Sequence, residues 1–329
     1  MNKLLKFKNK KIKGRFFVFL ITLISLFIIH NSVAEAQTLG LSITPPIAEV
    51  MIIPGKIVTQ TFTITNDGND GMASIYIIPF KAQGESGNVA LDEKNAVTAT
   101  SPYASWFSII SPVSVFGEKF YMAGGQRQEI TVKITPPESA TEKDYYFTLL
   151  YELDNNIPGG TLSMGPTNQA RIGSNLILSV SSDGNPPKTA EIVEFKAPKI
   201  IDSLEKLTFN TRIGNFGSYV FKPDGEITIK PTFGSVETLS LAPLNIISDS
   251  VRNIPCLKGE EIIVCQSNRK VLVGVYKSTL EITPNGSGET QSKTVTTVAF
   301  PFSIIFGLLL IFITYRIIKK SQKVGKESS

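Results

Sequence analysis

The side chains that most often carry out catalysis are scarce in this sequence. Its single histidine, His30, ends an apolar N-terminal segment and would be lost with an export signal. The rest of the chain then has no residue for Ser-His or Cys-His nucleophiles, for zinc sites that contain histidine, or for histidine acid-base catalysis. Carboxylate pairs and Ser-Lys systems pass this test, but no spacing indicates either. We therefore predict no enzyme: no catalytic residues, no cofactor and no metal.

The two cysteines, Cys256 and Cys265, stand nine positions apart around Lys258-Gly259-Glu260, a centre that suits a hairpin turn. In an exported chain without a third cysteine, this spacing favours a disulfide that closes a small loop. Two free thiols are the alternative if the compartment is not oxidising. A metal site would have too few soft ligands.

Asp67 and Asp70 lie in the run Asn66-Asp67-Gly68-Asn69-Asp70-Gly71 and offer oxygens for calcium. The run lacks the longer alternating acidic loop and the distal glutamate of a calcium hand, so it favours a plain turn. Trp106 is the only tryptophan, and it could either contact sugar or pack in the core. Its apolar neighbours favour the core.

Tyr145 and Tyr146 fall where a sandwich corner tyrosine bonds backbone, so we expect structural roles for both. Arg171 opens the last strand of the first predicted domain, where it binds either an anionic partner group or an acidic neighbour. Asn285-Gly286-Ser287 matches a glycosylation acceptor, but the short signal and the bacterial character of the leader favour an unmodified asparagine.

The N-terminus has the layout of a secretory signal. Seven Lys and Arg residues precede the apolar segment 16–29, and Ala34-Glu35-Ala36 supplies a small-x-small cleavage motif. We predict a signal peptide over 1–36 with cleavage between Ala36 and Gln37. An uncleaved anchor is the alternative, although the segment is short for a membrane core that needs roughly 20 residues.

A second apolar segment predicts a transmembrane helix over 298–318. Arg316, Lys319, Lys320, Lys323 and Lys326 lie at its end and in the predicted basic tail, 319–329. Basic residues favour the cytoplasmic side, so we predict a single-pass protein of the cell membrane with an extracellular N-terminal part.

The net charge of +5 comes from the two ends of the chain. Of the 33 Lys and Arg and 28 Asp and Glu residues, 21 basic and 26 acidic residues remain between 37 and 298, a net charge of −5. This balance excludes the basic surface that nucleic-acid binding requires.

The exposed part divides into two predicted domains, 38–182 and 188–297. The linker is Asp183-Gly184-Asn185-Pro186-Pro187, which combines turn formers with two prolines. Short β-branched and aromatic runs, separated by turn residues, predict the strands of both domains. In 57–66 the alternation places Val58, Phe62 and Ile64 on one face. The pattern predicts an all-β protein of two tandem immunoglobulin-like β-sandwiches.

The further runs read as strands span 39–53, 73–80, 105–110, 128–135, 145–153 and 172–181 in the first domain, and 191–195, 207–213, 225–229, 237–241, 262–265 and 270–282 in the second. The stretch 283–293 has two interpretations, a hairpin turn into a final strand or a short stalk. The following Thr294-Val-Thr-Thr-Val298 favours the strand.

Several motifs resemble the WxL-interacting protein family. They are Ser42-Ile-Thr-Pro-Pro-Ile-Ala-Glu49, Pro54-Gly55, Thr61 to Asn66, Trp106 to Ile109, Ala123-Gly-Gly125, Ile130 to Pro137, Asp144-Tyr-Tyr146 and Gln169 to Gly173. The resemblance implies a signal peptide, an N-terminal peptidoglycan-binding domain, a second immunoglobulin-like domain that contacts other proteins, and one C-terminal span. The cysteine pair and the stretch 215–225 depart from the family pattern.

The first domain also resembles, more distantly, fimbrial assembly chaperones, which lend a strand to a subunit. We predict a membrane-anchored bacterial surface protein that binds cell-wall peptidoglycan or another envelope protein. The alternatives are a structural spacer or assembly subunit without its own ligand, and a chaperone-like strand-donating module.

Overall fold

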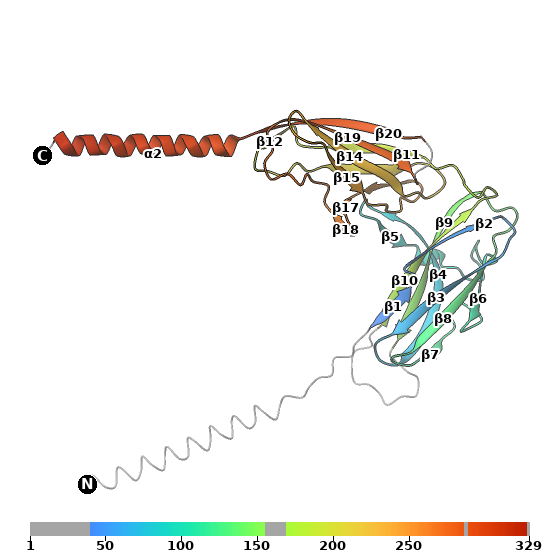
Figure 1. Cartoon of the computed structure of the whole chain (residues 1–329). Helices are drawn as coiled ribbons and strands as arrows, with labels where there is room; N and C mark the ends of the chain where they lie inside the picture. Colours follow the sequence, from blue (N-terminus) through green and yellow to red (C-terminus); the bar gives the residue numbers. More distant parts are fainter. Residues whose placement is uncertain (1–39, 155–168, 286–288, 328–329) are drawn as a thin grey trace, which may run out of the picture.

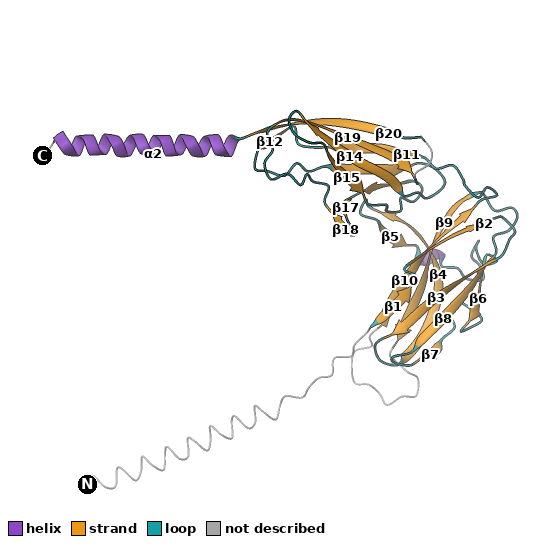
Figure 2. Cartoon of the chain, in the orientation of Figure 1, coloured by secondary structure: helices purple, strands orange, loops and turns teal. Residues whose placement is uncertain are grey.

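The computed structural model describes residues 40–154, 169–285 and 289–327. Strands dominate them, and one long helix ends the chain (Figures 1 and 2). Two β-sandwiches follow one another, and helix α2 (Phe302–Glu327) extends from the second. The predicted all-β fold with tandem immunoglobulin-like sandwiches and a C-terminal apolar helix is confirmed. The predicted signal segment and its cleavage site, Ala36 and Gln37, lie outside the described residues.

The first sandwich has two sheets. One has the order β1 (Leu41–Thr44), β3 (Val58–Asn66), β8 (Arg127–Ile134) and β6 (Phe107–Ser111). The other has the order β2 (Ile47–Ile52), β10 (Gln169–Val180), β9 (Lys143–Asp154), β4 (Gly71–Gln83) and β5 (Asn88–Leu91), with β7 (Phe120–Met122) also on β4. A short 3-10 helix, η1 (Glu93–Asn95), follows β5.

The core of the first sandwich forms where inward residues of the two sheets meet. Phe62 and Ile64 of β3 are fully buried, as their alternation predicts, and Val58 is partly buried. Phe147 and Tyr151 face them from β9 in the same apolar cluster. Fully burying each such side chain stabilises the fold by about 1.5 to 3 kcal/mol.

The first strand changes sheet at two prolines. The sequence predicts extended structure over 39–53, and the structure divides it into β1, antiparallel to β3, and β2, parallel to β10. Pro45 and Pro46 stand between the two strands. Because proline has no N–H and a fixed φ, it ends one ladder and lets the chain cross to the other sheet.

The second sandwich also has two sheets. The smaller has the order β11 (Ala190–Lys196), β13 (Asn210–Asn215) and β16 (Ser250–Asn253). The larger has the order β12 (Ile200–Asp202), β20 (Gln291–Phe300), β19 (Gly274–Pro284), β14 (Pro223–Pro231), β15 (Glu237–Leu241), β17 (Cys256–Lys258) and β18 (Glu261–Ile263). Phe221, Ile227 and Leu280 lie in the core between the sheets.

Two predicted boundaries differ from the structure near the C-terminal helix. The strand predicted over 270–282 begins at Gly274, and residues 270–273 form a loop. The span predicted from 298 begins later, because β20 continues to Phe300 and α2 starts at Phe302. The final strand predicted after 293 is confirmed as part of β20, while residues 286–288 lie outside the described part.

The predicted disulfide is present. The Sγ atoms of Cys256 and Cys265 are 2.08 Å apart and the Cα atoms 4.8 Å apart. Both side chains are buried in the second core, where they join the β17–β18 hairpin to the chain that leaves it.

Replacing both cysteines by alanine should destabilise the second sandwich by about 2 to 3 kcal/mol, because the small loop is no longer closed in the unfolded chain. Denaturation of the full chain in detergent, followed by circular dichroism, checks the result. Trp106 fluorescence serves as the control because it reports the first sandwich. Unchanged unfolding of the second sandwich would contradict the prediction.

Candidate functional site

Strand β10 is covered along only half of one side. Its whole length pairs with β9, from Gln169 opposite Asp154 to Val180 opposite Lys143. On the other side, β2 pairs only with the part from Asn175 to Val180. Among the described residues, no strand pairs with that side of residues 169–174. We call this stretch the open edge of β10.

The direction of the backbone N–H and C=O groups at the open edge follows from Asn175, the next residue of β10. The Asn175 N–H donates to the Pro46 carbonyl oxygen at 3.1 Å, so it points toward the β2 side. Backbone groups alternate along a strand, which places the N–H and C=O of Gln169, Arg171 and Gly173 on the same side. These groups form a template for an added strand.

The open edge borders apolar side chains that are only half buried. Ala170 and Ile172 of β10 pack against the first core, and so do Leu41 and Ile43 of β1. Two of the four residues come from each sheet, and those of β1 precede the crossing at Pro45. We call these four residues the apolar seam. A strand laid against β10 would place alternate side chains on it.

Two other sheet ends are blunted. Strand β6 carries a bulge between Ile109 and Ser111, and Pro112 follows directly. Strand β18 has only three residues. Bulges, prolines and short strands are the usual protections against unwanted pairing, which makes the longer open edge of β10 the better candidate.

Arg171 sits on the outer face of β10 and is already paired. Its guanidinium binds Glu152, directly opposite on β9, and its Nη1 lies 3.0 Å from Glu93 Oε1. The hydrogen bond to Glu152 raises the pKa of Arg171. Of the two interpretations from sequence, pairing with an acidic neighbour is confirmed.

Trp106 and Tyr145 have structural roles, as predicted. Trp106 is 6% exposed, and its ring centroid lies 4.7 Å from that of Tyr145 and 5.2 Å from that of Tyr103. The Tyr145 hydroxyl donates to the Thr141 carbonyl oxygen at 3.1 Å, four residues upstream, in the manner of a corner tyrosine.

The 66–71 segment forms the predicted turn. Asp70 accepts hydrogen bonds from the Gly124 N–H at 2.7 Å and the Tyr121 hydroxyl at 2.6 Å. These bonds, the backbone one foremost, lower the pKa of Asp70. The Asn66 amide donates to the carbonyl oxygens of Asn69 and Ala123, which fixes the turn.

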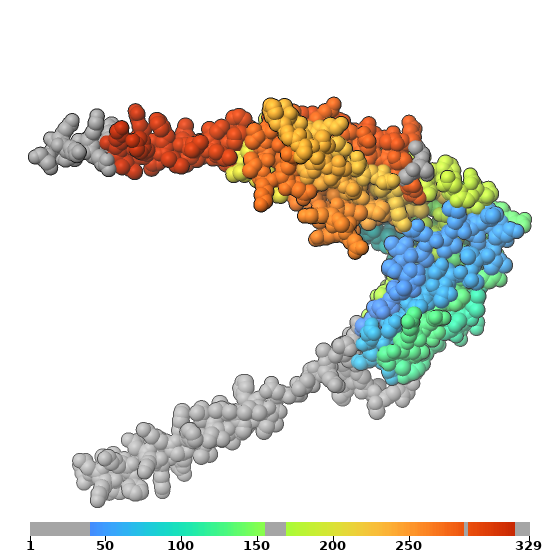
Figure 3. All heavy atoms as spheres, viewed as in Figure 1, coloured from blue at the N-terminus to red at the C-terminus, as the bar shows by residue number. Residues whose placement is uncertain are grey.

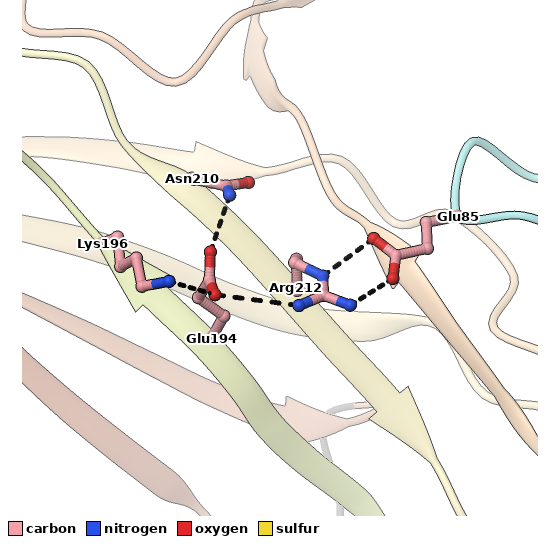
Figure 4. Close-up of polar contacts among 5 residues, drawn as sticks. All are labelled: Glu85, Glu194, Lys196, Asn210 and Arg212. Atoms are coloured by element: carbon pink, nitrogen blue, oxygen red, sulfur yellow. Dashed lines mark hydrogen bonds and ion pairs between the residues drawn. The ribbon is translucent and has the colours of Figure 1, made fainter.

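Charged residues join the two sandwiches. Glu85, in the β4–β5 hairpin, binds the guanidinium of Arg212 on β13 through two nitrogens (Figure 4). Arg212 Nη1 also lies 3.7 Å from Glu194, which in turn accepts hydrogen bonds from Asn210 and Lys196. A paired, bidentate arginine fixes direction as well as distance, so this network orients one sandwich against the other.

A second set of contacts lies beside the linker. The Tyr146 hydroxyl bonds Ser248 at 2.7 Å, and the Tyr219 hydroxyl donates to the Val180 carbonyl oxygen at 3.1 Å. Tyr146 therefore has a structural role too, as a contact between the sandwiches, while Tyr145 is the one that bonds backbone. Burial, foremost, raises its pKa, so its hydroxyl stays protonated.

A cleft between the sandwiches contains Arg252, a residue that sequence reasoning missed. It encloses about 70 Å³, and Ile47, Phe80 and Ile177 line it from the first sandwich. Arg252 donates to the Asn245 carbonyl oxygen at 2.5 Å, and burial lowers its pKa. We assign Arg252 a packing role.

The similarity of this chain to known proteins is one of fold. No protein-family model matches the sequence, so membership of the WxL-interacting family stays a prediction. A comparison with characterised proteins finds no match.

The solved structures that the chain resembles include immunoglobulin-like fimbrial chaperones. A chain from the chaperone–tip adhesin complex of CFA/I fimbriae is 10% identical, covers 79% of this chain and 99% of its own, and has a TM-score of 0.37. A chain from the Salmonella enterica SafA pilin–SafB chaperone complex is 11% identical, covers 79% of this chain and 98% of its own, and has a TM-score of 0.36. The E. coli chaperone DraB is 12% identical, covers 79% of this chain and 99% of its own, and has a TM-score of 0.34.

Asp144 supplies a test of the contact between the sandwiches. Its Oδ2 accepts from the Val220 N–H, its Oδ1 is buried without a partner, and burial raises its pKa above the ordinary 3.8. The folded state therefore holds the proton more tightly than the unfolded state. Stability falls as pH rises from 3.8 through the raised pKa.

Replacing Asp144 by asparagine should remove this pH dependence and leave the protein at least as stable as wild type at pH 7. Thermal unfolding of both proteins between pH 4 and 7 measures the difference. A wild type that gains stability over the Asp144→Asn variant as pH rises would refute this account of Asp144.

Proposed function

We propose that this chain is a membrane-anchored bacterial surface protein that captures an extended segment of another envelope polypeptide along the open edge of β10. The half-covered side of β10 is the observation that carries the proposal. We infer a binding protein and not an enzyme.

Strand addition supplies both affinity and selectivity at such an edge. The outward backbone groups of Gln169, Arg171 and Gly173 offer hydrogen bonds to any chain, independent of its sequence. The apolar seam then selects chains with apolar residues at alternate positions, because successive side chains of a strand point to opposite faces. A polar or proline-rich segment would leave the seam exposed or break the ladder.

The anchor is helix α2. Its residues Phe302–Lys319 have a mean hydropathy of 2.0, and they are long and apolar enough to cross a membrane. Basic residues end the apolar stretch and continue beyond it, which favours a cytoplasmic C-terminus. In this orientation both sandwiches stand outside the cell membrane.

The spacer alternative from sequence draws support from a different feature. The Glu85–Arg212 pair and the contacts beside the linker join the sandwiches into one unit, as a spacer requires. A spacer makes no use of the open edge, so the two functions separate experimentally. Binding to peptidoglycan stays a prediction, tested by sedimentation of the full chain in detergent with purified cell wall.

A photo-reactive amino acid at position 169 should cross-link to a polypeptide on intact cells. The same amino acid at Ser108, which is exposed on the blunted strand β6, is the matched control and should give little adduct. Mass spectrometry of the adduct should identify a segment with apolar residues at alternate positions. Equal adducts at both positions, or none at position 169, would favour the spacer.

The apolar seam has its own test. Ala170→Glu places a carboxylate among half-buried apolar side chains, and it should lower the yield of captured polypeptide at least about tenfold, the equivalent of 1.4 kcal/mol. Gln169→Glu adds the same charge on the exposed face and should retain most of the capture. Trp106 fluorescence confirms folding of each variant. Equal loss in the two variants would contradict a role for the seam.

A further inference from the structure

The second sandwich joins its helix without a stalk. Strand β20 ends at Phe300, α2 begins at Phe302, and Pro301 alone separates them. Asp202 of β12 ties the junction. Its Oδ2 accepts from the Ser303 N–H at 2.8 Å and its Oδ1 from the Ser303 hydroxyl at 2.7 Å. The end of the sandwich is therefore held close to the point where the apolar helix begins.

Strand register brings exposed apolar residues to that end. Val298 of β20 lies opposite Val275 of β19 on one side and Ile200 of β12 on the other. These three side chains are 39%, 42% and 63% exposed. They form a row across the sheet, two residues before the strand ends at Phe300.

Two loops add to this row. The Thr232 N–H donates to the Val275 carbonyl oxygen at 2.8 Å, which places Phe233 beside the start of β19. Phe233 is 78% exposed. The Leu272 N–H donates to the Ser203 carbonyl oxygen at 2.9 Å, which brings the 271–273 loop next to Leu204.

We call these residues the membrane-end patch: Ile200, Leu204, Phe233, Val271, Val273, Val275, Val298 and Phe300. Figure 1 shows α2 leaving the second sandwich at the end where β12 lies, and Figure 3 shows the same junction in space-filling form. Soluble proteins rarely leave so many large apolar side chains exposed together unless the surface meets a partner or a membrane.

The charges around the patch fit a lipid surface. Lys199, Lys206 and Lys270 are exposed beside it, together with the acidic Glu205. Arg269 is paired with Glu237. Exposed lysines are attracted to the headgroups of anionic lipids. Apolar tips flanked by lysine are typical of surfaces that lie in the interface of a bilayer.

We propose that the membrane-end patch lies in the headgroup region of the bilayer that α2 crosses, so that the second sandwich rests on the lipid. The inference depends on the proposed membrane anchor. It does not depend on the open edge of β10. Lipid contact at the patch and the ties at Asp202 hold the sandwich in one orientation to the membrane.

Phe233→Trp tests the contact in the full chain, reconstituted in nanodiscs whose lipids carry bromine on the upper part of the acyl chains. The indole should lose about half of its emission relative to unbrominated lipid, because bromine quenches tryptophan only at contact range and apolar interfacial side chains reach about 5 to 10 Å into the boundary. The native Trp106, buried in the first sandwich, gives the background, which should not change.

Phe216→Trp is the matched control. Phe216 is also exposed, at 55%, but it follows β13 at the opposite end of the second sandwich, beside Ala190 of β11. Its indole should not be quenched. Phe306→Trp in α2 reports insertion and should be quenched.

Quenching at position 306 without quenching at 233 would overturn the lipid contact and leave the anchor intact. The same pattern of quenching is expected if a second protein, and not lipid, covers the patch, so that case also overturns the proposal. Absence of quenching at both positions would overturn the anchor, and with it this inference. Equal quenching at 216 and 233 would show that lipid contact is not confined to the membrane-end patch, which also contradicts the proposal.

Discussion

The crossing of the first strand at Pro45 and Pro46 determines how much of one side of β10 is left without a strand partner. A sandwich strand has two sides to satisfy, and β10 receives β9 along all of one side but β2 along only half of the other. Had the first strand stayed in one sheet, β10 would be either fully covered or fully open. The crossing leaves a short edge next to half-buried apolar residues. Its short length limits unwanted association, and in the proposed function the apolar seam selects the captured segment.

The rest of the chain holds this edge at a defined place. Glu85 and Arg212 join the sandwiches by a bidentate pair, and the polar contacts of Tyr146 and Tyr219 close the other side of the interface. At the opposite end, Asp202 ties β12 to the start of α2. The geometry thus connects α2 to the open edge through packed elements. With α2 as the proposed anchor, a captured segment would sit at a set height above the lipid.

Local patterns in the sequence predicted much of this fold. Alternation placed Phe62 and Ile64 in the core, and the Lys258-Gly259-Glu260 turn between two cysteines predicted the disulfide, because each depends on neighbours only a few residues away. Glu85 and Arg212 are 127 residues apart, and only the docking of two finished sandwiches brings them together. The open edge was missed for the same reason. It depends on where β2 ends relative to β10, a register that no stretch of either strand encodes alone.

Amide hydrogen exchange of β10 measures the central claim most directly. In the free full chain, the account predicts fast exchange at Arg171 and Gly173, whose N–H groups face the open side, and slow exchange at Ile177 and Ser179, which face β2. In the complex with the polypeptide captured through position 169, the first pair should become protected. Protection of Arg171 and Gly173 in the free chain, or fast exchange in the complex, would contradict strand addition at this edge.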